Sequence, residues 1–249
     1  MINENYNKLL QMKLDRMAEL YLSLSNQKMF NELPFDEKMA ILIDGQLEEN
    51  KTRSIELLRR KASIRIPSAS LNDISFFPER QIDKVLTLKL HECGFISEKL
   101  NVIITGATGA GKTYYVSALA NSVIDKGIRV KYIRLPDLIY ELNSFRETPK
   151  SFRRKMRLYG RIPLLIIDDF LISPLNESQS SDVFELLELR SGSYSTILAS
   201  QFETSHWHER LGSGAIADAI MDRIIHDSYI INIKGDKSMR EVTSRIKDN

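Results

Sequence analysis

The octapeptide GATGAGKT, at residues 106–113, carries the clearest chemistry in this chain. It matches the pattern G-x-x-x-x-G-K-[ST], in which glycines let backbone amides turn toward phosphate groups. In such loops the lysine reaches the β- and γ-phosphates and the last hydroxyl binds Mg²⁺. We therefore expect a nucleoside triphosphate with Mg²⁺, held by Gly106, Ala107, Thr108, Gly109, Ala110, Gly111, Lys112, Thr113 and Tyr114.

Two adjacent carboxylates follow a short apolar run in LLIIDDF, residues 164–170. A buried strand that ends in acid delivers that acid at its carboxyl edge, beside the phosphate loop. We expect Asp168 to hold the metal together with Thr113, and Asp169 to orient or deprotonate an attacking water. The alternative for Asp169 is that it only caps the following turn.

Two further polar residues are candidates for catalysis. Gln201 follows the run STILAS and is expected where it can sense the γ-phosphate or position water. Arg223 precedes the last apolar run, and two interpretations stay open. It is either a structural partner of Asp218 or Asp222 on its own helix, or an arginine finger that crosses a subunit interface.

Basic residues gather in two segments, although the net charge of the chain is only +2. Residues 51–65 hold six basic residues against Glu56, and residues 145–161 hold seven against Glu147. Such clusters are typical of binding to a nucleic-acid backbone, and a solvated helix face is the alternative. The predicted DNA-binding residues are Arg59, Arg60, Lys61, Arg153, Arg154, Lys155 and Arg157.

The elements that position these residues fall into two patterns. Residues 1–67 have apolar residues at helical spacing, broken near Pro34, and form a small helical domain. Residues 68–249 alternate short apolar strands with helices, which predicts an α/β fold with a parallel five-stranded sheet. The expected strands are 101–105, 129–133, 164–168, 195–200 and 229–233, and the main expected helices are 112–125, 137–146, 179–190 and 215–224.

Composition limits the remaining classes of protein. The single cysteine, Cys93, excludes an internal disulfide and a zinc site built on cysteines. The longest apolar runs are far shorter than the roughly 18 residues of a membrane span, and the first residues lack signal-peptide character. We expect a cytoplasmic protein that does not contact a membrane.

The order of these motifs resembles the IstB-like AAA+ ATPases, the helper proteins of insertion-sequence transposition, and their relatives, the DnaC-type helicase loaders. The similarity extends over nearly the whole chain, including its helical leader, which favours the transposition helper. It is carried by RRKASIRIP at 59–67, GATGAGKT, LLIIDDF, TILASQF with Trp207 shortly after, DRI at 222–224 and GDKSMR at 235–240.

The resemblance implies a P-loop AAA+ core that binds ATP and assembles, with ATP, into a homo-oligomer on double-stranded DNA. It also implies contact with a transposase that the ATPase stimulates or directs to target sites. Asp168 and Asp169 become the Walker B pair, Gln201 the sensor, and Arg223 a finger acting on a neighbouring subunit. Arg240 is a weaker candidate for a phosphate contact. The basic clusters suit phosphate contact without base-specific readout.

This sequence departs from the family pattern at several positions. Tyr114 and Tyr115 replace a Thr- or His-like residue and leucine, Leu171 replaces a glycine, and Gln201 often is asparagine. Three other functions are alternatives: a helicase loader with the same core, a small-molecule kinase, and a nucleotide-binding scaffold without turnover. The order of motifs suits ATP hydrolysis that drives motion better than phosphoryl transfer to a small molecule.

Overall fold

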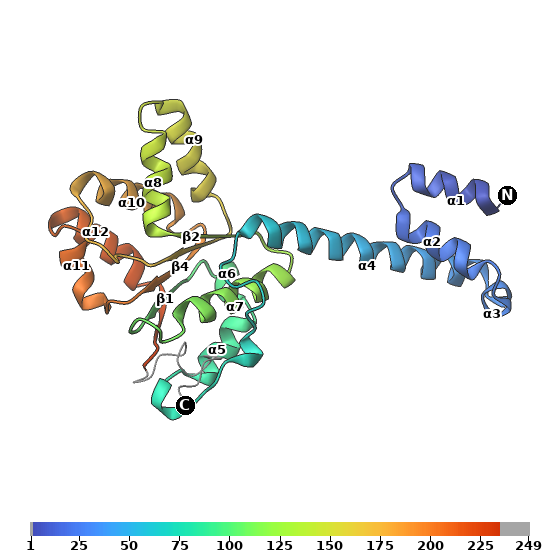
Figure 1. Cartoon of the computed structure of the whole chain (residues 1–249), viewed down its shortest axis with the longest axis horizontal. Helices are drawn as coiled ribbons and strands as arrows, with labels where there is room; N and C mark the ends of the chain where they lie inside the picture. Colours follow the sequence, from blue (N-terminus) through green and yellow to red (C-terminus); the bar gives the residue numbers. More distant parts are fainter. Residues whose placement is uncertain (1, 235–249) are drawn as a thin grey trace, which may run out of the picture. The chain divides into compact units, whose positions relative to one another are not determined.

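The computed structural model describes residues 2–234 (Figure 1). The chain forms two compact units, Met1–Leu57 and Leu58–Asn249, and helix α4 (Phe35–Ala62) continues through the point of division. The domains predicted at 1–67 and 68–249 stay a prediction. The segment GDKSMR, with Arg240, lies outside the described residues.

The first unit is helical, as its apolar spacing predicts. Its buried side chains include Ala18, Phe30 and Leu42. Gly45 faces Leu20 closely: a Cβ atom there would lie 2.3 Å from Leu20 Cδ1, so the leucine side chain would have to shift. The unit contains α1 (Ile2–Gln11), α2 (Asp15–Leu24), α3 (Lys28–Glu32) and most of α4.

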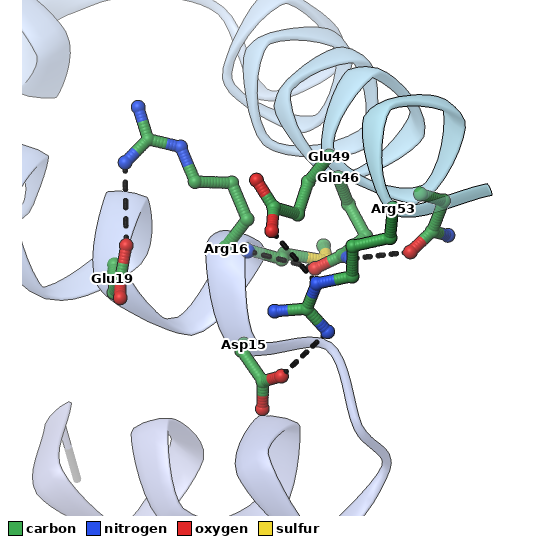
Figure 2. A network of polar contacts seen from close by, with 8 residues as sticks. Asp15, Arg16, Glu19, Gln46, Glu49 and Arg53 are labelled. Atoms are coloured by element: carbon green, nitrogen blue, oxygen red, sulfur yellow. Dashed lines mark hydrogen bonds and ion pairs between the residues drawn. The ribbon is translucent and has the colours of Figure 1, made fainter. Parts of the chain in front are cut away.

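A network of polar contacts joins α2 to α4 in this unit (Figure 2). The backbone amide of Met17 donates to the buried Gln46 side chain at 3.0 Å. Arg53 contacts Asp15 at 3.0 Å and Glu49 at 2.7 Å. The guanidinium of Arg53 therefore links the start of α2 to α4.

The second unit is built on a parallel five-stranded sheet in the order β2-β3-β4-β1-β5, which confirms the predicted α/β class. Each strand has five or six residues, mostly β-branched or apolar, as is typical of buried parallel strands. The strands are β1 (Asn101–Thr105), β2 (Val130–Arg134), β3 (Leu164–Asp168), β4 (Ser195–Ser200) and β5 (Ser228–Asn232).

Helices cover both faces of this sheet, with α5 and α7 on one side and α8, α9, α10 and α12 on the other (Figure 1). Alternate residues of each strand point to opposite faces, so that Ile103, Ile167 and Leu198 pack with α8, α10 and α12. The helices are α5 (Lys84–His91), α6 (Gly94–Ser97), α7 (Lys112–Asp125), α8 (Leu135–Ser144), α9 (Pro149–Gly160), α10 (Glu177–Arg190), α11 (Trp207–Arg210) and α12 (Gly214–Ile225).

Three short 3-10 helices complete the unit, η1 (Leu71–Asp73), η2 (Pro78–Arg80) and η3 (Thr204–His206). The basic segment 145–161 contains a separate helix, α9, which the apolar pattern did not predict. This helix has few apolar positions, and only Met156 and Tyr159 among its larger side chains are buried. Over residues 2–234, no helix combines the length and apolar character needed to cross a membrane.

The register of the sheet places the functional candidates at one edge. Thr105 of β1 pairs with Ser200 of β4, and Arg134 of β2 pairs with Asp168 of β3. The phosphate loop, the second carboxylate and Gln201 each follow one of these strand ends. Because all strands are parallel, their carboxyl ends meet at the same edge, where nucleotide sites form in open α/β sheets.

Candidate nucleotide site

The phosphate loop joins β1 to α7, as its sequence predicts. Gly106 has φ +150°, and a Cβ atom there would lie 2.2 Å from the carbonyl oxygen of Ile233. No larger residue fits this position, because the obstacle is backbone. Gly111, with φ +94°, precedes the first turn of α7, so the free amides of that turn face the loop.

The side chain of Lys112 lies within the loop. Its ammonium group donates to the carbonyl oxygens of Gly106 at 2.7 Å and Ala107 at 2.9 Å. Burial lowers the pKa of Lys112, while the carboxylates of Asp168 and Asp169 act in the opposite direction. Both carboxylates are therefore close enough to influence the lysine that is expected to bind phosphate.

Asp168 is buried, with 1% of its surface exposed, and three groups fix its carboxylate. The Thr113 hydroxyl donates to Oδ2 at 2.8 Å, the Tyr132 hydroxyl donates to Oδ2 at 2.6 Å, and the Asp169 amide donates to Oδ1 at 2.8 Å. Burial and the neighbouring carboxylate raise the pKa of Tyr132, which therefore stays a donor.

The adjacent hydroxyl and carboxylate of Thr113 and Asp168 fit Mg²⁺. This ion prefers oxygen ligands and binds through one or two protein groups together with substrate phosphates and water. The described residues contain no cluster of three or more His, Cys, Asp or Glu side chains that could hold a metal by themselves. A magnesium ion at this place would thus depend on the nucleotide for its remaining ligands.

Asp169 points toward two arginines. Its Oδ2 accepts a hydrogen bond from Arg134 Nε at 2.7 Å, and Arg65 Nη1 lies 3.7 Å away. The side chain is 26% exposed and thus reachable by water. The turn after Asp169 is closed by a backbone hydrogen bond, from Ile172 N to Asp169 O at 3.2 Å. The turn therefore does not depend on the Asp169 carboxylate alone.

The turn after the carboxylates has an unusual backbone. Asp169 and Leu171 have φ values of +50° and +55°. Glycine adopts this region freely, whereas other residues incur a cost of about 1–2 kcal/mol. Leu171 is completely buried in the hydrophobic core, and this burial offsets the cost. The position therefore accepts leucine in place of the glycine that the family pattern has.

A cavity of about 690 Å³ lies above the phosphate loop, within the range usual for small-molecule sites. Gln201 reaches it from the end of β4 and accepts a hydrogen bond from Thr108 Oγ1 at 2.8 Å. Tyr114 lines its wall and donates to Asp73 at 3.2 Å. Arg65, Lys112, Thr113 and Asp169 also line the cavity.

Arg223 lies in the last turn of α12, and its partner differs from the expected ones. Its Nε contacts the Glu188 carboxylate of α10, Nη1 donates to Ala219 O at 3.1 Å, and the guanidinium lies 4.8 Å from the Phe184 ring. The expected intrahelical partners pair elsewhere, namely Asp218 with His208 and Asp222 with His226. Arg223 therefore has a structural partner on α10 and not on its own helix, because α10 packs against α12, and its role as a finger stays a prediction.

The basic residues of α9 divide into two groups. Lys155 pairs with Glu141 at 2.6 Å, and its side chain is only 25% exposed. Burial raises the pKa of Glu141, but the bonds from Lys155 and Tyr159 outweigh this and lower it overall. Arg153, Arg154 and Arg157 are exposed. Three arginines of α9 are therefore accessible to a partner, whereas Lys155 is paired with Glu141.

The basic residues at the end of α4 also divide. Arg59 pairs with Asp125 at 2.5 Å, while Arg60 and Lys61 are exposed. The pair with Asp125 anchors the last turn of α4 to the end of α7.

Sequence reasoning missed Tyr132 and Arg134, which both lie on β2, and the place of Arg65 in the cavity. The apolar alternation of β2 identified a strand, but no local motif marked these residues as partners of the carboxylates. One signal was available: Arg134 ends a strand at the same edge as Asp168, so the strand order would have placed it there.

Comparisons with known proteins show the family and the fold of this chain. A model of the IstB-like ATP binding protein family matches residues 7–246. The insertion sequence ATP-binding protein y4pL of Sinorhizobium fredii is 32% identical over 94% of this chain and 95% of its own. The IS1162 ATP-binding protein of Pseudomonas fluorescens is 31% identical over 82% of this chain and 88% of its own. The DnaC helicase loader superposes with a TM-score of 0.55 and 21% identity over 67% of this chain and 97% of its own, so the fold is that of AAA+ P-loop proteins.

Proposed function

Because the chain belongs to the family of IstB-like ATP-binding proteins, we propose that it is an ATPase that helps an insertion sequence to transpose. In this proposal ATP drives assembly of a homo-oligomer on double-stranded DNA, and the oligomer stimulates a partner transposase or directs it to target sites. The relatives' names, which connect ATP binding with insertion sequences, support this choice over the other uses of the fold.

The contact of 2.8 Å between Thr113 and Asp168 carries the ATPase part of the proposal. These residues would hold Mg²⁺, which neutralises phosphate charge and orients the γ-phosphate when it is bound. Lys112 replaces its two carbonyl partners by phosphate oxygens. Asp169 orients the attacking water and accepts its proton, because it is the neighbouring carboxylate that stays partly open to solvent.

Helix α9 supports the DNA part. Its sequence, PKSFRRKMRLYG, holds five basic residues and no acidic one, and Arg153, Arg154 and Arg157 are exposed. Within residues 2–234 no ion pair involves Arg154 or Arg157. Free guanidinium groups on one helix attract phosphates of any sequence, so we expect binding to duplex DNA with little preference for its bases.

The test is ATP turnover with and without duplex DNA. We expect DNA to raise turnover, and the double variant Arg154→Gln, Arg157→Gln to weaken DNA binding for all sequences alike. The log–log salt slope should fall by up to about 0.9 per lost phosphate contact. The control with equal net charge is Lys28→Gln, Lys84→Gln, two exposed lysines elsewhere.

An unchanged salt slope in the α9 variant would show that α9 does not touch DNA. Turnover that rises with a metabolite instead of DNA would favour the kinase alternative. Capture of a replicative helicase, with no capture of a transposase, would favour the helicase loader.

Arg223 is proposed as the arginine finger of the oligomer. It lies 28% exposed at the end of α12, and Glu188 holds it in the isolated chain. A neighbouring subunit's ATP would compete with Glu188 for the same guanidinium, since both are anions. Where such fingers are known they contribute about 10³–10⁵ in rate.

Mixing two inactive variants tests this role. Arg223→Ala retains a complete pocket but no finger, whereas Lys112→Ala retains the finger but no working pocket. Junctions between the two should recover turnover, and Glu188→Gln should keep turnover because it leaves the finger in place. If ATP still drives assembly in the mixture and no activity returns, Arg223 acts within its own subunit.

A further inference from the structure

Arg65 lies beside the second carboxylate of the candidate nucleotide site, Asp169. It lines the cavity together with Lys112, Thr113 and Asp169. Its Nη1 is 3.7 Å from Oδ2 of Asp169, the carboxylate that follows Asp168. No role in nucleotide binding follows from its sequence position, 41 residues before the phosphate loop begins at Gly106.

The backbone around Arg65 is fixed on both sides. Before it, Lys131 of β2 donates to the Ser63 hydroxyl at 3.0 Å, and the Ile64 side chain is buried. After it, the Asn121 side chain of α7 donates to the carbonyl oxygens of Pro67 at 3.1 Å and Ala69 at 2.8 Å. These contacts tie the segment to β2 and α7, so the base of the Arg65 side chain has a defined place beside the site.

The guanidinium of Arg65, by contrast, is loosely held. Arg134 makes a true hydrogen bond to Asp169 at 2.7 Å, whereas 3.7 Å is too long for one. The side chain of Arg65 is 46% exposed, and Arg134 is not among the residues that line the cavity. Of the two arginines beside Asp169, Arg65 is thus the one that can turn toward a ligand without breaking a hydrogen bond to that carboxylate.

We propose that Arg65 binds the γ-phosphate of ATP from within the same subunit. This inference rests on the proposed function in one respect, namely that ATP occupies this cavity with its phosphates on Lys112. A phosphate group carries more negative charge than a carboxylate and offers two oxygens to the planar guanidinium. The bound phosphate therefore replaces Asp169 as the partner of Arg65, and Asp169 keeps its hydrogen bond with Arg134.

This role predicts discrimination between ATP and ADP. An arginine on the γ-phosphate contributes to the binding of ATP and not of ADP, because ADP has no group at that place. A residue that only supports the fold of the loop would affect both nucleotides equally. The ratio of the two affinities therefore separates the two roles.

The experiment measures the affinities of a non-hydrolysable ATP analogue and of ADP, both with Mg²⁺, by competition with a fluorescent nucleotide. We expect Arg65→Gln to weaken the ATP analogue about 10- to 100-fold, the range of a charge-assisted hydrogen bond, and ADP less than about twofold. Arg65→Lys should fall between the wild type and Arg65→Gln. Arg129→Gln, at an exposed arginine before β2, should change neither affinity.

An equal loss for both nucleotides, or no loss for either, in a folded Arg65→Gln protein overturns the proposal. Thermal unfolding checks that the variant is folded, and if it is not, Arg65→Lys gives the same ratio test with the charge kept. A wild-type protein that binds neither nucleotide refutes the proposed function itself. A wild type that binds ATP while Arg65→Gln keeps its ATP-to-ADP ratio refutes only the role of Arg65.

Discussion

Replacing Lys112 with alanine isolates the contribution of one cation to nucleotide affinity. In the structure its ammonium group has two acceptors, Gly106 O at 2.7 Å and Ala107 O at 2.9 Å. When a triphosphate binds, these neutral carbonyl groups are exchanged for phosphate oxygens. The gain in affinity is therefore the difference between the two sets of partners and not the full strength of two new bonds.

The size of this difference follows from the charges. Two unit charges about 4 Å apart attract each other by about 4 kcal/mol at an effective dielectric constant of about 20, whereas the carbonyl groups carry no net charge. Partial loss of water from both ions reduces the gain. We expect a net contribution of about 3 kcal/mol, which corresponds to a loss of about a hundredfold in ATP affinity in the Lys112→Ala protein.

Isothermal titration calorimetry with ATP and Mg²⁺ measures the change. Lys126→Ala is the matched control, because Lys126 ends the same helix, α7, and donates to the carbonyl oxygen of Glu92, away from the phosphate loop. Thermal unfolding should show that both variants are folded. An ATP affinity within about threefold of the wild type in a folded Lys112→Ala protein would refute the assignment of the loop as the phosphate site.

Three further predictions concern the same site. The substitution Asp169→Asn should keep ATP affinity within about threefold. It should lower turnover, measured in a steady-state ATPase assay, by about 10²–10⁴, the range of general-base catalysis. An equal loss of ATP binding would instead show that Asp169 is a metal ligand or a structural residue. Tyr132→Phe removes a donor to Asp168 and should raise the Mg²⁺ concentration for half-maximal turnover about tenfold, and an unchanged Mg²⁺ requirement would contradict this positioning role. Burial lowers the pKa of Lys112 below 10.5, and phosphate binds its protonated form, so ATP affinity should be full below that pKa and fall as the pH rises through it. Titrations of ATP affinity at increasing alkaline pH measure this decline, which Lys126→Ala should retain, and an equal decline in Lys112→Ala would show that it does not come from Lys112.

Local sequence predicted the parts of the site whose geometry is local. The phosphate loop, the strand before it and helix α7 came from one continuous segment, because the glycines, the lysine and the helix start lie within a few residues of one another. The carboxylates could be placed at a strand end for the same reason. The alternation of short apolar segments with helices then predicted the five-stranded parallel sheet. The predicted ends of the strands differ by one residue at most from those observed.

Long-range partners were beyond this kind of reasoning. Arg134 and Asp169 are 35 residues apart, and so are Arg223 and Glu188, and in neither pair does spacing along the chain indicate a contact. The inward turn of Lys155 onto Glu141 likewise depends on how α8 packs against α9. The sequence does not distinguish a basic residue that faces solvent from one that pairs with a carboxylate.

The sequence by itself thus predicted a triphosphate site and determined the strands of the sheet, because chirality and strand pairing leave parallel β–loop–α units few alternatives. Only the tertiary structure decided which charged groups surround that site. The order β2-β3-β4-β1-β5 brings Arg134 beside Asp169, and the segment after α4 brings Arg65 to the same carboxylate. Such contacts result from packing between elements, and the free energy of that packing depends on the whole unit rather than on any short segment.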